Sequence, residues 1–214
     1  MNPALDSRWQ AALPAGATLH ALAPKHLDGL LAVQRACYGA ALVEGAEVFA
    51  RRLASPAQCS LVAEVDGQVG AYLAAYHSVQ GKVTPLQGDF GSVAPPGAAD
   101  TLYLHDLAVL PQLAGRGLAQ ALLARLHGQA LAHGLRRAAL VSVQGSQPFW
   151  QRQGYAAQAL AQPAQRAQLA RYGAGAVYMA RRLDSGSGSG SPISNNSGSN
   201  GGSGSSSGSG VSPV

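Results

Sequence analysis

The chain has 214 residues and a net charge of +5, from 15 Lys and Arg against 10 Asp and Glu, with a sequence pI of about 9.6. Arginine supplies nearly all of this charge in scattered residues or pairs, without interleaved aromatic residues, and this pattern disfavours nucleic-acid binding. No apolar run of about 18 residues indicates a membrane helix. Two cysteines make neither a disulfide framework nor a metal site. The opening residues lack a signal-peptide pattern, so we expect a cytoplasmic location.

The expected elements of the first half follow from apolar periodicity and from turn residues. Pro24 suits the first turn of a helix, and Pro56 ends the second helix. Asp66-Gly67 between two apolar runs predicts a strand hairpin. In chain order we expect a strand over 17–22, helices over 24–38 and 45–55, strands over 58–65 and 68–79, and a long loop over 80–100.

The second half predicts a strand followed by a long helix, whose apolar stripe includes Leu118, Leu122 and Leu126. After the helix come a buried-type strand, a short helix and a final pair of strands. The expected ranges are 102–110, 118–134, 137–143, 148–153, 156–160 and 176–182. This order predicts an α/β fold with a mixed, mostly antiparallel central sheet and helices on both faces.

Composition divides the chain into three parts. Residues 1–16 predict a loose N-terminal arm, and residues 17–184 have the length of one domain. Residues 185–214 are almost wholly Ser, Gly and Asn, with no aromatic and no charged residue. Such a segment cannot bury enough apolar surface to offset the entropy of ordering it, so we predict a flexible tail.

One stretch, 101–134, combines a strand, a glycine-containing turn and a helix. Pro111 ends the strand, because proline cannot donate to a sheet ladder. The turn that follows leaves unpaired backbone N–H groups at the start of the helix. These groups and the positive end of the helix dipole favour an anion, so the stretch predicts a phosphate-binding site.

The spacing of the glycines selects among the known phosphate-binding motifs. No lysine follows Gly117, which excludes a P-loop. Gln120 stands where a dinucleotide fingerprint needs its third glycine. The spacing Gln112-x-x-Gly115-x-Gly117 instead resembles motif A of the GCN5-related N-acetyltransferases (GNAT), which bind the pyrophosphate of acetyl-CoA. A glycine-rich turn without a ligand is the plain alternative.

The resemblance extends over about 17–183, because the order of elements is also typical of that family. It implies the acyl-CoA N-acyltransferase fold, acetyl-CoA as co-substrate and no metal. It further implies that the backbone of two strand residues, Leu107 and Val109, pairs with the pantetheine arm, while amides of the turn hold the pyrophosphate. The expected cofactor-binding residues are Leu107, Ala108, Val109, Gln112, Ala114, Gly115, Arg116, Gly117, Leu118 and Ala119.

A second resemblance, at 149–155, concerns the proton for the leaving thiolate. The family often has a tyrosine there as general acid, but this chain has Trp150, whose indole N–H is no usable acid near neutral pH. Tyr155 matches the aromatic residue that packs into the core. Ser142 or Ser146 is then the candidate to relay a proton through water, with water alone as the alternative.

His105 and Asp106 are the candidates for binding or deprotonating the acceptor amine. Adjacent strand residues point to opposite faces, so only one of them faces a cleft unless a bulge intervenes. The resemblance implies such a bulge in this strand. Polar residues with a purely structural role are the alternative. Tyr72, Tyr76 and His77, from the preceding strand, are further candidates for lining the acceptor site.

The sequence therefore predicts an acetyl-CoA-dependent N-acetyltransferase that acts on a primary amine of a small molecule or peptide, by direct attack on the thioester. The catalytic candidates are Asp106, His105 and Ser146. A non-catalytic CoA-binding module is the alternative, suggested by Trp150, and a nucleic-acid-associated protein is a weaker one, suggested by the pI. The sequence leaves open the acceptor and whether the chain forms a homodimer.

Overall fold

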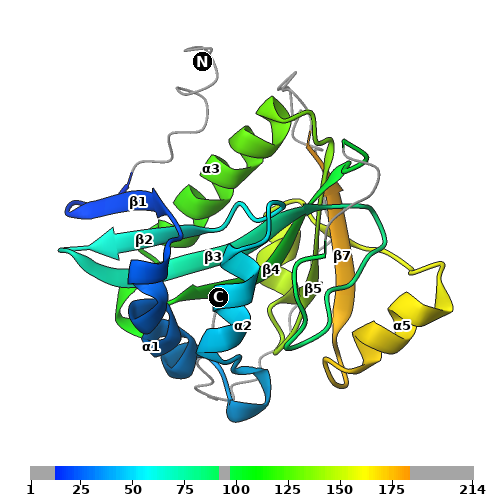
Figure 1. The fold of residues 1–214 in the computed structure, drawn as a ribbon, viewed down its shortest axis with the longest axis horizontal. Coiled ribbons are helices and arrows are strands. Elements are labelled where there is room, and N and C mark those ends of the chain that lie inside the picture. The colour runs from blue at the N-terminus through cyan, green and yellow to red at the C-terminus, as the bar shows by residue number, and fades with distance from the viewer. Residues whose placement is uncertain (1–12, 92–96, 184–214) are drawn as a thin grey trace, which may run out of the picture.

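The computed structural model describes residues 13–91 and 97–183, so most of the predicted arm and the whole predicted tail lie outside the described residues. Its centre is a seven-stranded sheet with the spatial order β1-β2-β3-β4-β5-β7-β6 (Figure 1). Only β4 and β5 run parallel; all other neighbouring strands are antiparallel. The strands are β1 (Ala17–Ala21), β2 (Leu61–Val65), β3 (Gln68–Ser78), β4 (Thr101–Val109), β5 (Arg137–Ser142), β6 (Ala156–Ala157) and β7 (Val177–Arg182).

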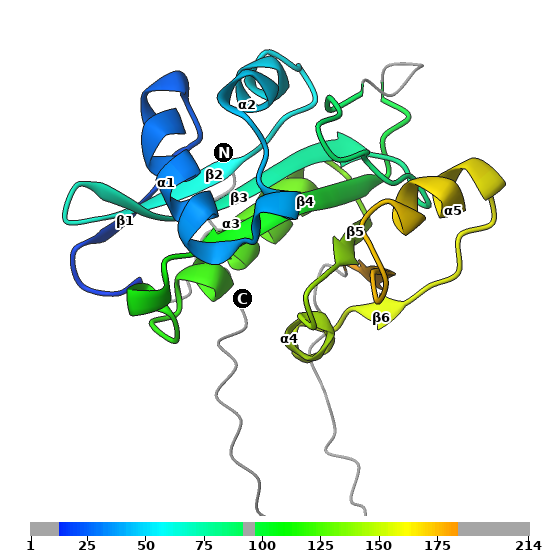
Figure 2. The same cartoon turned by 90° about the horizontal axis from the view of Figure 1, so that it is seen from below.

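Helices cover both faces of this sheet, as predicted. They are α1 (Leu27–Cys37), α2 (Ala46–Leu53), α3 (Leu118–Ala132), α4 (Gln147–Arg152) and α5 (Pro163–Ala170). Seen from below, α1 and α2 lie on one side of the sheet, with α3 and α4 on the other (Figure 2). Successive strand residues supply the two cores: Tyr72 is buried on the α1–α2 face and Leu73 on the α3 face.

Two parts of the second half differ from the prediction. The strand expected over 156–160 is only two residues long, and helix α5 occupies a stretch where no element was expected. The eight residues of α5 include none that is buried, so its apolar periodicity is weak. Pro163 in the first turn was the available sequence signal for its start.

The strand expected over 58–65 begins only at Leu61. The residues before it still follow β3: the amide of Cys59 donates to the Ala75 carbonyl over 2.9 Å, and Gln58 forms an isolated bridge with Tyr76. The prediction of this strand was therefore right in type and placed its start three residues early.

The parallel strands β4 and β5 are paired over only half of β4. Their register joins 101–104 to 137–140 and then stops. Within the described residues no strand pairs with the remainder of β4, 105–109, on the side away from β3. The sheet therefore opens at the C-terminal end of β4, next to the turn that leads into α3.

Candidate active site

A β-bulge in β4 decides how the two catalytic candidates are oriented. On β3, Ala74 pairs with Asp106 and the next residue, Ala75, pairs with Leu104, so His105 is the extra residue. A bulge of this kind lets two successive side chains leave the strand on the same face. The structure therefore resolves the alternative that the sequence left open, because both His105 and Asp106 line one cleft.

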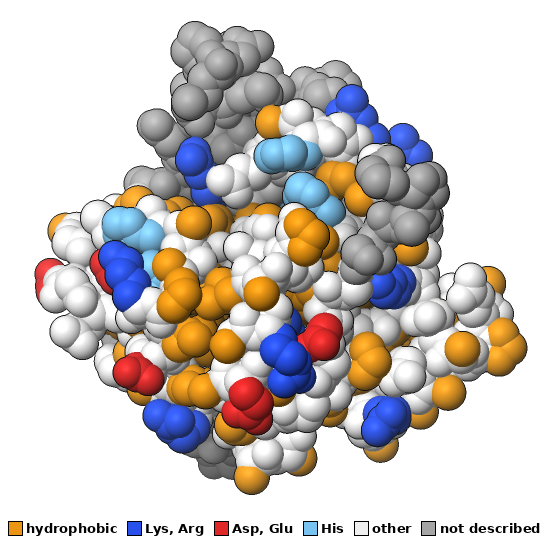
Figure 3. Space-filling model, in the orientation of Figure 1, with side chains coloured by type: hydrophobic (Ala, Val, Ile, Leu, Met, Phe, Trp, Pro, Cys, Tyr) orange, Lys and Arg blue, Asp and Glu red, His pale blue; other side chains and the backbone are white. Residues whose placement is uncertain are grey.

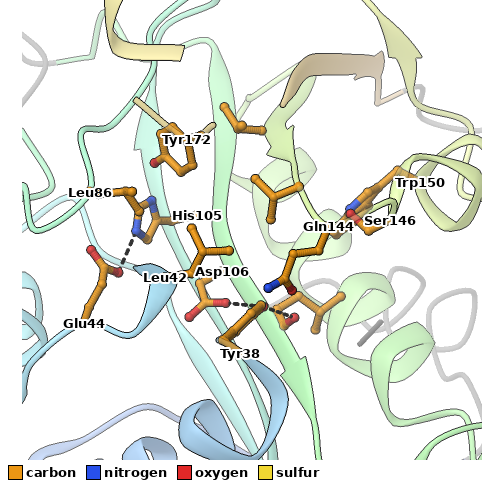
Figure 4. A pocket seen from close by; sticks show the side chains of 13 residues that line it. Tyr38, Leu42, Glu44, Leu86, His105, Asp106, Gln144, Ser146, Trp150 and Tyr172 are labelled. Carbon is orange, nitrogen blue, oxygen red and sulfur yellow. Dashed lines mark hydrogen bonds and ion pairs between the residues drawn. The ribbon is translucent and has the colours of Figure 1, made fainter. Parts of the chain in front are cut away.

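The cleft lies at the opening between β4 and β5 and encloses about 590 Å³, including its mouth to solvent. His105 and Asp106 are on its floor, between two walls (Figure 4). One wall comes from the α1–α2 region, from the loop after β3 and from the segment after α5, with Tyr38, Leu42, Glu44, Leu86 and Tyr172. The opposite wall comes from β5 and the start of α4, with Val141, Val143, Gln144, Ser146 and Trp150.

Asp106 is held by polar groups of α1 and β3. Its carboxylate accepts hydrogen bonds from the Tyr38 hydroxyl over 2.6 Å and from the Tyr72 hydroxyl, with the Gln34 amide at 3.4 Å. Burial raises the pKa of Asp106 above its ordinary value, and these hydroxyls oppose the rise. A cation that enters the cleft would lower the pKa again, because an opposite charge favours the carboxylate.

His105 is the end of a buried charge network. Its Nε2 lies 2.9 Å from a carboxylate oxygen of Glu44, which also accepts two hydrogen bonds from Arg52 at 2.5 and 2.6 Å. Only 2% of each of these three side chains is exposed. Burial alone would raise the pKa of Glu44, but His105 and Arg52 together hold it far below its ordinary value.

The second ring nitrogen of His105 has no such partner. Among the described residues none makes a hydrogen bond to Nδ1, although the atom is buried. The two ring nitrogens therefore have different surroundings: Nε2 lies against Glu44, which orients the ring, and Nδ1 has no hydrogen-bond partner among the described residues.

The turn that leads into α3 has the backbone geometry of an anion site. Gly115 and Gly117 have φ angles of 75° and 86°, in the left-handed region that favours glycine. A Cβ built on either would meet no described atom within 4 Å, so the space beside both is open. A side chain here would be strained and would occupy that space.

Several amides of this turn are free to bind an anion. Ala114 and Arg116 donate to the carbonyls of Pro111 and Leu113 within the turn. The amides of Gly115 and of 117–120, by contrast, have no hydrogen-bond partner within 13–91 and 97–183. Together with the N-terminus of the 15-residue helix α3, they make a site that fits a phosphate group.

The exposed side of β4 connects this turn to the cleft. The Leu110 amide donates to the Gly70 carbonyl of β3, so by alternation the backbone groups of Leu107 and Val109 face away from β3. The Leu107 carbonyl accepts from the Tyr38 hydroxyl at 2.8 Å, and that of Val109 from the Cys37 thiol at 3.1 Å. The pairing of this side of β4 with an extended ligand chain stays a prediction.

The residues of the second motif have different roles. The Tyr155 hydroxyl lies 2.9 Å from Nε2 of buried His127, which fits the structural role expected for it. Trp150 is 6% exposed, packs edge-on against Tyr155 and contributes to the cleft wall. Ser146 lies on the same wall, with its Oγ 3.0 Å from the Oγ of Ser142, so the two hydroxyls proposed as a relay are hydrogen-bonded to each other.

The three candidates on β3 are not equivalent. Tyr72 contacts Asp106. Tyr76 and His77, by contrast, are not among the described residues that line the cleft: the Tyr76 hydroxyl is bonded to Thr84, and the His77 ring lies 5.3 Å from that of His133. Alternation along β3 places Tyr72 and Tyr76 on the same face, but Tyr72, which pairs with Ala108, reaches Asp106, whereas Tyr76 pairs with Tyr103 on the other side of the bulge.

Sequence reasoning missed most residues of the cleft walls, and four polar or aromatic ones matter most for the site: Tyr38, Glu44, Arg52 and Tyr172. Glu44 follows α1, and Arg52, eight residues later, reaches back to it from α2. No local spacing rule marks such a pair. From the sequence, Tyr38 at the end of α1 could be the last apolar residue of the helix as easily as a residue of the site. A buried Arg is the only unusual feature, and burial is not visible in sequence.

A mixed sheet that opens beside a glycine-containing turn defines the acyl-CoA transferase class of folds. The model of the acetyltransferase (GNAT) family matches residues 28–169, and the chain belongs to this family. No curated protein matches the chain. The family assignment confirms the resemblance and the fold predicted from the sequence. It also supports acetyl-CoA as co-substrate, which the family's activity implies.

Solved structures of low sequence identity share the fold. One is the ribosomal-protein-S18-alanine N-acetyltransferase of Escherichia coli, at 14% identity and a TM-score of 0.57, covering 79% of this chain and 96% of that one. Another is the PaiA N-acetyltransferase of Thermoplasma acidophilum in complex with coenzyme A, at 12% and 0.54, covering 78% and 98%. A third is the GphF GNAT-like decarboxylase in complex with isobutyryl-CoA, at 16% and 0.61, covering 78% and 100%.

Two further observations concern membrane proteins and nucleic-acid-binding proteins, the two classes that the sequence disfavours. In the described part of the chain no helix is long and apolar enough to cross a membrane. On the face drawn in Figure 3, the Lys and Arg side chains are dispersed among other residues. The predictions of a cytoplasmic location and of no nucleic-acid partner stay predictions, and the oligomeric state stays open.

Proposed function

We propose that this protein is an acetyl-CoA-dependent N-acetyltransferase that acetylates a primary amine of a small molecule or peptide by direct attack on the thioester. One observation carries the proposal: the open side of β4 joins an anion-binding turn at one end to a cleft with His105 and Asp106 at the other. A long ligand with an anionic end and a reactive end matches that arrangement.

The donor half rests on backbone groups. The free amides of Gly115 and of 117–119 would hold the pyrophosphate, and Leu107 and Val109 would pair with the pantetheine arm as an added strand would. The titles of two solved structures that share the fold record bound coenzyme A and isobutyryl-CoA, which supports a coenzyme A thioester as the donor. The thioester then reaches the cleft between Asp106 and the β5 wall.

The acceptor half supplies the proton chemistry. A primary amine arrives as an ammonium ion, which Asp106 would bind and orient. His105 Nδ1 would accept its proton, with Glu44 stabilising the imidazolium that forms. The amine nitrogen then bonds to the thioester carbon, the carbon–sulfur bond breaks, and the second amine proton goes to the thiolate. Ser146, through water, is the candidate for that last transfer.

A degenerate CoA-binding module is the second candidate, because Trp150 stands where the resemblance implies an acid. The cleft beside it keeps a carboxylate and an oriented imidazole, which a binding module does not need. This difference favours the enzyme over the module, since buried charged groups are costly to retain without a use.

A screen of primary amines for the release of coenzyme A from acetyl-CoA tests the proposal. Amine-dependent release, with the acetylated amine identified by mass spectrometry, is the expected outcome. Tight acetyl-CoA binding with no release from any amine of a broad panel would establish the module instead. Failure to bind acetyl-CoA at all would refute both the enzyme and the CoA-binding module.

A further inference from the structure

We infer that the acceptor is a small primary amine with an apolar body and no anionic group near its amino group. The inference rests on the proposed function and makes it more specific: it names the class of amine. Three observations support it: the signs of the charges in the cleft, the hydrogen bonds that its tyrosine hydroxyls already make, and the apolar composition of its walls.

The cleft offers no positive partner to an anion. None of its described lining residues is Lys or Arg, and its two carboxylates belong to Glu44 and Asp106. The nearby cation, Arg52, is 2% exposed, with its guanidinium donating to both oxygens of Glu44 and to the Gly88 carbonyl. Arg52 therefore neutralises the charge of Glu44, and Asp106 is left as the carboxylate that would contact the acceptor.

The aromatic residues of the acceptor wall present rings rather than free hydroxyls. The Tyr38 hydroxyl is within hydrogen-bond distance of Asp106 and of the Leu107 carbonyl. The Tyr172 hydroxyl donates to the Thr84 carbonyl over 2.5 Å. With these donors committed, and with Leu42 and Leu86 beside them, the wall matches an apolar body (Figure 4).

An amine with a carboxylate next to its amino group would therefore be rejected. Its ammonium would meet Asp106, but its carboxylate would lose water near that acid and gain only neutral donors of the opposite wall, such as the Gln144 amide, and no cation in exchange. An unpaired buried charge is costly, and such repulsion is a source of specificity. Neutral amides of the same shape carry no such penalty, which separates the effect of charge from that of size.

The experiment compares matched acceptors with the full-length wild-type protein and acetyl-CoA. One set is phenethylamine, phenylalaninamide and phenylalanine; the other is isopentylamine, leucinamide and leucine. Rates of coenzyme A release are divided by the unprotonated fraction of each amine, so that basicity is not mistaken for recognition. We expect kcat/KM for the amine and the amide to exceed that for the amino acid on the order of 100-fold.

A charge added to the wall should relax this selection. In Leu86→Arg, a guanidinium reaches the cleft, and the ratio of amine to amino acid is expected to fall about tenfold relative to the wild type. Leu13→Arg makes the same substitution at an exposed position outside the described lining residues and should leave the ratio unchanged. Leu42→Arg is the second variant if Leu86→Arg shows a lowered melting temperature.

The outcomes separate the inference from the proposed function. Amino acids used as well as their amines, or amides as poor as the amino acids, would overturn the inference while coenzyme A release still supports the enzyme. Turnover confined to anionic amines of a broader panel would do the same. No release from any amine, with acetyl-CoA bound, would overturn the inference and the proposed function together.

Discussion

The two halves of the proposed site are built from different parts of the chain. The donor half uses the backbone of one continuous stretch, from Leu107 to Ala119, with glycines that leave amides accessible. The acceptor half uses side chains from α1, the loop after it, α2, β3 and β4. A local backbone motif has a sequence signature, whereas a constellation of side chains exists only once the chain has folded.

The halves also differ in what holds them together. The donor half depends on the conformation of two glycines and on open space beside them. The acceptor half depends on buried charges that satisfy one another, with Glu44 between Arg52 and His105. A substitution in the donor half should therefore change ligand affinity, and one in the acceptor half should change stability or turnover. The predictions that follow test this division.

The largest expected effect is on the donor half. Gly117→Trp places a ring in the open space beside the free amides, so acetyl-CoA affinity should fall about 1000-fold or more, below detection by titration calorimetry. Gly67→Trp is the matched control, because Gly67 has a φ of 76° and equally open surroundings, far along the chain in the β2–β3 turn. Undiminished binding by Gly117→Trp would contradict the assignment of 112–117 to a pyrophosphate-binding motif.

The next largest effect is on the stability of the acceptor half. Arg52→Met removes the guanidinium and leaves Glu44 buried with half of its partners, so the free energy of unfolding should fall by about 3 kcal/mol. Arg51→Met is the adjacent control: its ion pair with Asp89 is half exposed, and its loss should cost less than about 1 kcal/mol. Equal losses in urea unfolding would mean that the buried network adds no stability.

Acidification should weaken the protein through a buried histidine of α3, the helix that follows the donor half. Burial lowers the pKa of His127, on α3, to about 3, below its ordinary value of 6.5. The unfolded chain therefore takes up the proton between these two values, and unfolding free energy falls as the pH falls, by about 1.4 kcal/mol per unit.

His127→Gln should remove that slope between pH 6.5 and 4 in urea unfolding curves. The carboxylate of Glu44 acts in the same sense but at lower pH: its depressed pKa gives stability that is present above the ordinary pKa of a glutamate and is lost as the pH falls below it. An unchanged slope in the variant would show that His127 does not control the acid limit.

Turnover tests the acceptor half directly. Asp106→Asn keeps the shape but removes the charge that is proposed to bind the ammonium, so kcat/KM for the amine should fall about 100-fold. Acetyl-CoA affinity, measured by calorimetry, should stay within about threefold, because the donor half is untouched. Unchanged kinetics with the amine would remove Asp106 from the mechanism.

The smallest effect is expected where the two halves meet. Trp150→Tyr introduces a phenol on the wall of the cleft, where the family resemblance implies an acid, and kcat should rise only a few-fold if thiolate protonation limits the rate. Trp150→Phe fills similar space without a proton and is the control. A gain in both variants would indicate a packing effect rather than acid catalysis.

The order of elements and the glycine-containing turn before α3 were predictable because both depend on local patterns. The hairpin at Asp66-Gly67, the proline stop at 111 and the glycine spacing at 115 and 117 all act within a few residues. Helix α5 was missed because it has no buried residue, so its sequence carries no apolar stripe to detect.

His105 and Asp106 show where the local pattern stops being sufficient. The sequence selected both as candidates but allowed only one to face the cleft, since strand side chains alternate. The bulge opposite Ala74 and Ala75 changes that, and it arises from the pairing of β4 with β3. Sequence named the residues, and the pairing of two strands oriented them.

By itself, then, the sequence determined the family, the fold class and the turn that fits a phosphate, because each is set by neighbours along the chain. Only the tertiary structure decided that Glu44 and Arg52 belong to the site, that Tyr38 contacts Asp106, and that no described cation lines the cleft. These are contacts between segments far apart in sequence, and burial and charge pairing act through space rather than along the chain.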